Sequence, residues 1–213
     1  YDPVRLKRLR REARTMTAVQ SDHVCKVHYL GVERGTPFIV MERLHGETLR
    51  SRLRHGGPMT VAEAVTITCQ LLDALTATHE AGLIHRDLKP SNVFLSSRGD
   101  DVHVKLIDFG LAKLMRSSDA ESAERSADDD LTSAEMISGT LHFLAPEQLL
   151  CVGDLDERVD VYAAGLTLYE MLTGRRAFRG TYSEVVHDIV FNEPPRVTDV
   201  RPELPAVLDD VLV

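Results

Sequence analysis

The stretch "IHRDLKPSNVF" at residues 84–94 crowds charged side chains between two apolar runs. A histidine, an arginine, an aspartate and a lysine stand together at 85–89, and Asn92 follows closely. Charged side chains are seldom buried unless they are paired, so packing alone does not explain this crowding. The stretch is therefore interpreted as a functional loop.

Asp87 and Lys89 supply the first part of the chemistry. A carboxylate in a loop can accept the proton of a hydroxyl or orient that hydroxyl as a nucleophile. Lys89 follows two positions later, so in an extended loop both side chains would point to the same side. A cation beside a base suits a reaction in which negative charge moves through the substrate.

Asn92 and Asp108 supply the second part. Asp108 follows the apolar run "KLI", and Gly110 permits a sharp turn directly after it. An amide oxygen and a carboxylate that converge on one point form the oxygen site that Mg²⁺ prefers. A base, a cation and a magnesium site together predict phosphoryl transfer to a hydroxyl.

Three motifs stand in order along the chain: "HRDLKPSN" at 85–92, "DFG" at 108–110 and "APE" at 145–147. Together they resemble the signature set of the eukaryotic-type (Hanks-type) protein kinases. The stretches "RREAR" at 10–14 and "GTLHFLAPEQ" at 139–148 resemble the corresponding sequences of bacterial serine/threonine kinases. The resemblance covers essentially the whole chain.

The resemblance implies roles for individual positions. It makes Asp87 the catalytic base, Lys89 the phosphate-stabilising cation, and Asn92 and Asp108 the Mg²⁺ ligands. His85 would pack against Phe109. The positions that it implies for ATP binding are Glu12, Met41, Glu42, Leu44, Phe94, Ile107 and Asp108, of which Met41, Phe94 and Ile107 are also expected in the core. The positions that it implies for regulation are Arg86, Thr132, Ser133 and Thr140, with a phosphate at Thr132 or Ser133 pairing with Arg86.

The implied fold is a truncated two-lobe α+β kinase fold. Residues 1–44 would form part of a small lobe, with a helix over 4–19, strands over 24–32 and 37–42, and a hinge. Residues 45–213 would form a mainly helical large lobe. Its expected elements are a short helix over 45–53, a helix from a capping box at Thr60 and Glu63 to about Ala81, a hairpin around 96–101 and a buried helix over 156–173. Val61, Val65, Leu72 and Leu75 are expected on one face of the second helix.

Composition restricts the class of protein. The chain has 213 residues, of which 43% are hydrophobic, and a net charge of −8, which argues against a nucleic-acid partner. Three widely spaced cysteines indicate a reducing compartment, and no run approaches the ~18 apolar residues of a membrane span. A cytoplasmic location is expected. The start at Tyr1 and the apolar helical end suggest a fragment, so a membrane anchor outside it stays an open alternative.

The expected activity is transfer of the γ-phosphate of ATP, with Mg²⁺, to protein serine or threonine hydroxyls. Lys89 and "SGTLHFLAPEQ" at 138–148 resemble the corresponding residues of serine/threonine kinases, and this resemblance implies serine or threonine acceptors and not tyrosine. The sequence contains no Gly-rich loop and no strand lysine before Glu12, so we expect the polypeptide by itself to be inactive. A pseudokinase or docking module and a small-molecule phosphotransferase are the alternative functions. The expected partners are protein substrates and a second copy of the chain, in a homodimer for autophosphorylation.

Overall fold

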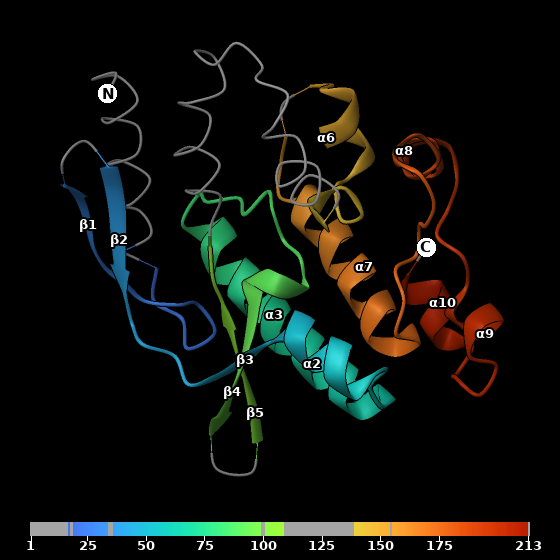
Figure 1. Cartoon of the computed structure of the whole chain (residues 1–213), viewed down its shortest axis with the longest axis horizontal. Coiled ribbons are helices and arrows are strands. Elements are labelled where there is room, and N and C mark those ends of the chain that lie inside the picture. Colours follow the sequence, from blue (N-terminus) through green and yellow to red (C-terminus); the bar gives the residue numbers. More distant parts are fainter. Residues whose placement is uncertain are drawn as a thin grey trace, which may run out of the picture.

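Two small antiparallel sheets and a group of helices make up the computed structural model (Figure 1). The structure describes residues 17, 19–33, 36–98, 101–108, 139–153 and 155–212. The helix expected over 4–19, which includes Glu12, therefore lies almost wholly outside the described residues.

The first sheet is a hairpin of β1 (Val27–Glu33) and β2 (Thr36–Met41). Its register pairs the first residue of β1 with the last residue of β2, and Glu33 with Thr36. Both strands expected from the sequence are confirmed, because each carries the β-branched and aromatic residues that favour strands.

The second sheet has the order β3–β4–β5, with β3 at Gly46–Thr48, β4 at Val93–Arg98 and β5 at Asp101–Leu106. The hairpin of β4 and β5 confirms the expectation for the residues around 96–101. All three strands are antiparallel to their neighbours, and Thr48 at the end of β3 pairs with Phe94 near the start of β4.

The expected helix over 45–53 was wrong at its beginning. Gly46–Thr48 pairs with β4, and α2 (Leu49–Gly56) begins only after Thr48, whose hydroxyl accepts the N–H of Ser51 at 3.2 Å. Gly46 has a φ of 143°, and a Cβ at this position would stand 2.1 Å from the carbonyl oxygen of Leu95. Glycine therefore permits a close backbone pairing that the local pattern did not reveal.

The segment before β1 joins the two sheets. The N–H of Cys25 donates to the carbonyl of Leu106 at 2.9 Å, and the N–H of Leu106 donates to the carbonyl of His23 at 2.8 Å. These bonds form a short parallel bridge beside β5. Backbone hydrogen bonds thus connect the segment at 23–25 to β5, the strand that leads into Asp108.

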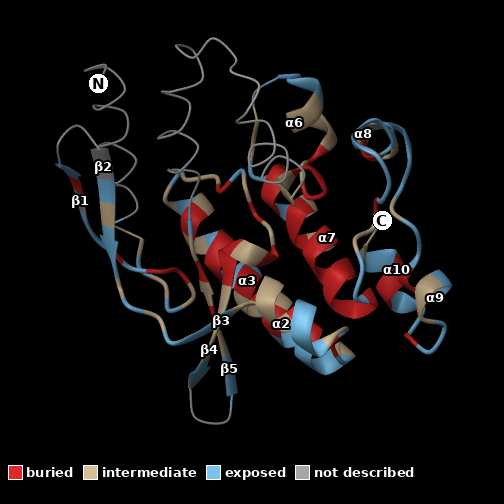
Figure 2. Cartoon of the chain, in the orientation of Figure 1, coloured by how far each residue is buried: buried red, intermediate tan, exposed pale blue. Residues whose placement is uncertain are grey.

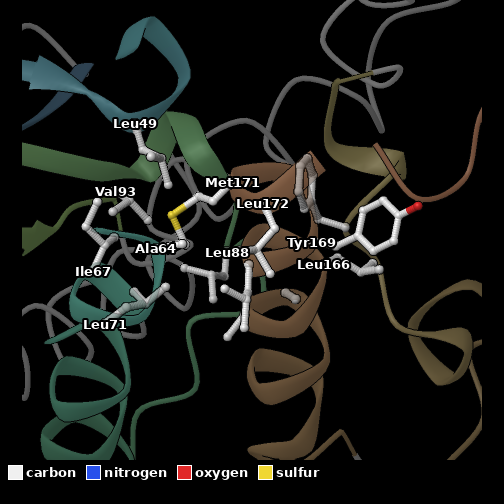
Figure 3. Close-up of a cluster of buried hydrophobic side chains, with 14 of the residues drawn as sticks. Leu49, Ala64, Ile67, Leu71, Leu88, Val93, Leu166, Tyr169, Met171 and Leu172 are labelled. Carbon is white, nitrogen blue, oxygen red and sulfur yellow. The ribbon is translucent and has the colours of Figure 1, made fainter. Parts of the chain in front are cut away.

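The core lies between α3 (Val61–Glu80) and α7 (Arg158–Thr173), which are in contact with each other (Figure 1). Both helices confirm the sequence expectation, including the capping box of Thr60 and Glu63. Figure 2 shows α7 buried along most of its length. The close-up of the core shows its side chains gathered between these elements (Figure 3); ten of them are Leu49, Ala64, Ile67, Leu71, Leu88, Val93, Leu166, Tyr169, Met171 and Leu172.

The expected apolar face of α3 was partly wrong. Val65 and Leu72 are 40% and 39% exposed. The buried positions are Ala64, Ile67, Leu71, Ala74, Leu75 and Thr78. Because α3 packs against both α7 and β5, its small alanines allow close approach and belong to the buried stripe. The sequence pattern, which weighted the larger apolar residues, selected a face rotated from the true one.

Short helices complete the chain: η1 (Pro90–Asn92), α6 (Pro146–Leu150), α8 (Tyr182–Phe191), α9 (Val197–Val200) and α10 (Val207–Val211). Arg201, after α9, donates from Nη1 to the carbonyls of Met59 at 3.2 Å and Leu172 at 2.7 Å. This guanidinium therefore satisfies carbonyls at the start of α3 and the end of α7 together. Among the described helices, none is both long and apolar enough to cross a bilayer.

Candidate active site

Asp160 on α7 holds the backbone of the loop that precedes β4. Its two carboxylate oxygens accept the N–H groups of His85 and Arg86, each at 2.8 Å. His79 of α3 contacts the same carboxylate at 2.8 Å. Asp160 is 1% exposed, and Arg86 has a left-handed φ of 60°. A buried carboxylate with this many donors fixes a backbone conformation that a non-glycine residue rarely adopts.

His85 lies fully buried under the same loop. Its Nδ1 accepts the N–H of Asp87 at 3.3 Å, so Nε2 carries the proton and donates to the carbonyl of Ile107 at 3.0 Å. Burial lowers the pKa of His85 below its usual value, which keeps the ring neutral. The residue therefore links the loop to the end of β5. Phe109, its expected packing partner, lies outside the described residues.

Asp87, Lys89 and Thr140 form a connected chain of polar groups. The Nζ of Lys89 donates to Oδ2 of Asp87 at 2.9 Å and to Oγ1 of Thr140 at 2.8 Å. The side chains of Asp87 and Lys89 are 14% and 21% exposed, so both reach the surface from a largely buried position. The ammonium is thus held beside a carboxylate, and the residues around 140 meet the loop at this point.

Asn92 and Asp108 are brought together by the backbone. The Nδ2 of Asn92 donates to the carbonyl of Asp87 at 2.9 Å, which directs the amide oxygen away from that carbonyl. The N–H of Ile107 donates to the carbonyl of Asn92 at 2.9 Å, and Asp108 follows with a φ of 59° and an exposed side chain. The backbones of Asn92 and Ile107 are thus adjacent, and an amide oxygen with a carboxylate is a donor set that Mg²⁺ accepts.

The segment predicted as the hinge follows β2 at 42–44. The N–H of Glu42 donates to the carbonyl of Lys26 at 2.9 Å, and its Oε1 accepts the ammonium of Lys105 at 2.9 Å. Burial by itself would raise the pKa of Glu42, but the hydrogen bonds from Lys105 and from the N–H of Lys26 outweigh it and lower that pKa. Leu44 is half-buried two residues later. The hinge is therefore anchored to β5.

The expectation that Met41, Phe94 and Ile107 lie in the core was wrong. Met41 is 38% exposed at the end of β2, and Phe94 and Ile107 are half-buried. Met41 is the last residue of β2, Phe94 is the second residue of β4, and Ile107 directly follows β5. They lie on the segments that also carry the hinge and Asp108, which leaves apolar surface available to a ligand.

Some predicted site residues could not be placed. Glu12, Thr132 and Ser133 lie outside the described residues. Arg86 is described and exposed, but Thr132 and Ser133, the expected positions of the phosphate that would pair with it, lie outside the described residues. The sequence reasoning also missed two residues with polar contacts at the site: Lys105, bonded to Glu42, and Gln148, bonded to the carbonyl of Arg86 at 3.1 Å. The residues next to Lys105 and Gln148 in the sequence do not predict these contacts, because each partner lies more than 60 residues away.

Comparisons with known proteins agree with this geometry. A family model described as "Protein kinase domain" matches residues 2–211. The serine/threonine-protein kinase PknE of Mycobacterium tuberculosis is 35% identical over 99% of this chain and 35% of its own length. PknL of the same species is 35% identical over 97% of this chain and 48% of its own length. The chain thus spans between a third and a half of these relatives.

Solved structures show the same fold. The kinase domain of Mycobacterium tuberculosis PknI is 26% identical, with a TM-score of 0.69 that covers 100% of this chain and 72% of that one. Rad53 in complex with AMP-PNP, at 24% identity, has a TM-score of 0.73 over 96% of this chain and 49% of its own. With these matches and the motif geometry above, the chain belongs to the protein kinase domain family.

Proposed function

We propose that the protein transfers the γ-phosphate of ATP to serine or threonine hydroxyls of protein substrates. The observation that carries this proposal is the Lys89 ammonium, bonded at once to Asp87 and to Thr140. A carboxylate beside a fixed cation serves a reaction that moves both a proton and negative charge. The similarity to serine/threonine kinases over nearly the whole chain supports it.

Asp87 is the group that meets the substrate hydroxyl. Its carboxylate orients the hydroxyl and takes up its proton as the oxygen attacks phosphorus. Lys89 lies beside it and neutralises charge on the oxygens of the transferred phosphoryl group. Thr140 holds the ammonium in place, so that the cation is in position before the reaction begins.

Asn92 and Asp108 would hold Mg²⁺. Their donor set fits because the nitrogen of Asn92 is engaged with the carbonyl of Asp87, which leaves the amide oxygen as the donor to a cation, and the carboxylate of Asp108 is exposed. The bound ion would neutralise charge on the phosphate oxygens of ATP. The role of this chain is to fix the two ligands through the bond between Ile107 and Asn92.

The adenine of ATP would lie at the hinge. Support comes from the anchored backbone at Glu42 and from the partly exposed apolar side chains of Met41, Phe94 and Ile107. The backbone of Leu44 would supply a further hydrogen bond to the adenine. Glu12 would pair with a nucleotide-binding lysine, as the family resemblance implies.

Regulation would act through Arg86. Its backbone is fixed by Asp160 while its side chain is exposed, so the guanidinium is available to a phosphate at Thr132 or Ser133. Self-phosphorylation by a homodimer would supply that phosphate. A cytoplasmic location belongs to the same proposal, since ATP and reduced cysteines are found there.

The test is the Asp87→Asn variant of the intact protein, incubated with labelled ATP and a general protein substrate. Because asparagine cannot take up a proton, we expect kcat to fall at least about a hundredfold. Asp101→Asn, the same change at an exposed strand end, is the matched control and should keep wild-type turnover. Equal turnover in Asp87→Asn would contradict the assignment of Asp87 as the base.

Mass spectrometry of the same samples locates the phosphate on the protein itself. Phosphate confined to residues 117–126 would contradict the regulatory role of Thr132 and Ser133.

A further inference from the structure

Gln148 bonds two separate segments with one side-chain amide. Its Oε1 accepts the N–H of Ala145 at 3.0 Å, and its Nε2 donates to the carbonyl of Arg86 at 3.1 Å. The first partner is a donor and the second is an acceptor, so the two together fix which end of the amide points where. Gln148 therefore connects the start of α6 to the loop that carries Asp87.

The first bond follows from the way α6 begins. Ala145 stands at the N-cap position and has no side-chain oxygen for the first turn of the helix. Gln148, three residues later, supplies the reciprocal half of a capping box by accepting the N–H of Ala145. This bond alone would explain the residue as a helix cap. It leaves the amide nitrogen to make the second contact.

The second bond falls on the peptide that enters the candidate base. The carbonyl of Arg86 and the N–H of Asp87 belong to one planar unit. Gln148 holds its oxygen, and Nδ1 of His85 accepts its N–H at 3.3 Å. The preceding N–H, of Arg86, is held by Asp160. The direction in which the Asp87 side chain leaves the backbone is set by these bonds, across a residue with left-handed φ.

We infer that Gln148 is a positioning residue. It couples the position of α6, the helix that begins in the "APE" motif, to the orientation of the Asp87 side chain. The inference rests on the proposed kinase function. When α6 is in place, the amide of Gln148 completes the set of donors and acceptors around the Arg86–Asp87 peptide. When it is displaced, the carbonyl of Arg86 loses this donor and the base gains freedom to rotate. The segment at 42–44, where adenine would bind, does not take part, so we expect ATP to bind equally well in both situations.

Gln148→Glu separates the two roles of this side chain. A glutamate keeps an oxygen for the N–H of Ala145, but it puts an oxygen where the carbonyl of Arg86 needs a donor. Gln70 of α3 is the matched control. Its Nε2 donates to the carbonyl of Val102 at 3.0 Å and its Oε1 accepts the N–H of Val104 at 2.8 Å. Gln70→Glu thus makes the same exchange of donor for acceptor at a site without catalytic residues.

The experiment compares the intact wild-type protein with both variants by amide hydrogen exchange and by steady-state kinetics. One net hydrogen bond corresponds to about a three- to tenfold effect. We expect exchange of the Arg86 and Asp87 amides to become faster by this factor in Gln148→Glu only. The kcat of that variant should fall by a similar factor, with the KM for ATP within about twofold of wild type.

Unchanged exchange at Arg86 and Asp87 in Gln148→Glu would overturn the inference. So would equal losses of kcat in Gln70→Glu, because the effect would then follow from general destabilisation. If the wild-type protein transfers no phosphate, the proposed function fails by itself, and the hydrogen-exchange comparison still decides the role of Gln148.

Discussion

A single buried histidine shows how the chain stabilises its candidate site. His85 is fully buried and neutral, because burial outweighs the hydrogen bond to Ile107 and the nearby carboxylates in setting its pKa. A ring that keeps one proton in one position can accept from Asp87 and donate to Ile107 at the same time. A second proton would place a donor against the N–H of Asp87. The residue therefore requires neutrality to hold the loop.

This requirement makes stability depend on pH. Since the pKa of His85 in the folded protein lies below the ordinary value of 6.5, the unfolded chain takes up a proton first as the pH falls. The contribution of His85 to the free energy of unfolding should therefore be complete above pH 6.5. Below pH 6.5 the free energy of unfolding should decrease, by at most about 1.4 kcal/mol per pH unit for one proton. Urea unfolding between pH 5 and 7 measures the slope.

His85→Gln isolates this contribution, because glutamine does not titrate. The pKa of His142 is also lowered, chiefly by burial, and its effect stays in both proteins. We expect a smaller slope in the variant over pH 5–6.5. An identical slope would show that His85 does not resist protonation in the folded state.

At the scale of elements, α3 begins with a complete capping box. The hydroxyl of Thr60 accepts the N–H of Glu63 at 3.2 Å, and the carboxylate of Glu63 accepts the N–H of Thr60 at 3.0 Å. The hydrogen bonds from Thr60 lower the pKa of Glu63. The sequence predicted this cap correctly, because both partners lie within one helical turn.

Removal of the cap should weaken the fold through α3. Thr60→Ala leaves the first-turn N–H groups without their side-chain acceptor, and we expect the free energy of unfolding to fall by about 1 kcal/mol. Thr66→Ala, at an exposed position within the same helix, is the control. It should be neutral or slightly stabilising because alanine has the higher helix propensity. A loss in both variants of the same size would contradict a capping role. Chemical denaturation measures each change.

At the scale of the whole molecule, Asp160 joins three parts of the chain. It lies on α7, contacts His79 of α3, and accepts two backbone donors of the loop before Asp87. One carboxylate thus connects the two central helices to the candidate catalytic loop. Asp160 and His85 are 75 residues apart in the sequence, so the tertiary fold brings them into contact.

Asp160→Asn should lower both stability and activity. The amide would present a donor to one of the two backbone N–H groups, so one of them loses its acceptor at a buried position. We expect the free energy of unfolding to fall by about 1–3 kcal/mol, with a lower kcat in the remaining folded protein. Asp156→Asn is the surface control; its carboxylate pairs with exposed Arg158, and both properties should stay near wild type. Wild-type kcat in folded Asp160→Asn would contradict the positioning role.

The sequence by itself determined what short-range chemistry can encode. Motifs such as "HRDLKPSN" carry their residue types at fixed local spacing, so they indicated the family and the candidates Asp87, Lys89 and Asn92. The cap of α3 and the hairpin of β4 and β5 were predicted for the same reason, since their partners lie a few residues apart.

Only the tertiary structure decided which distant segments meet. Gly46–Thr48 became a strand because β4 lies beside it, although the local pattern favoured a helix. Leu72 is exposed because α3 packs on its neighbours through a stripe that includes Ile67 and Leu71. The contact of Gln148 with Arg86 spans 62 residues. Burial and long-range hydrogen bonds depend on the whole arrangement of elements, and a local pattern of residues contains no record of that arrangement.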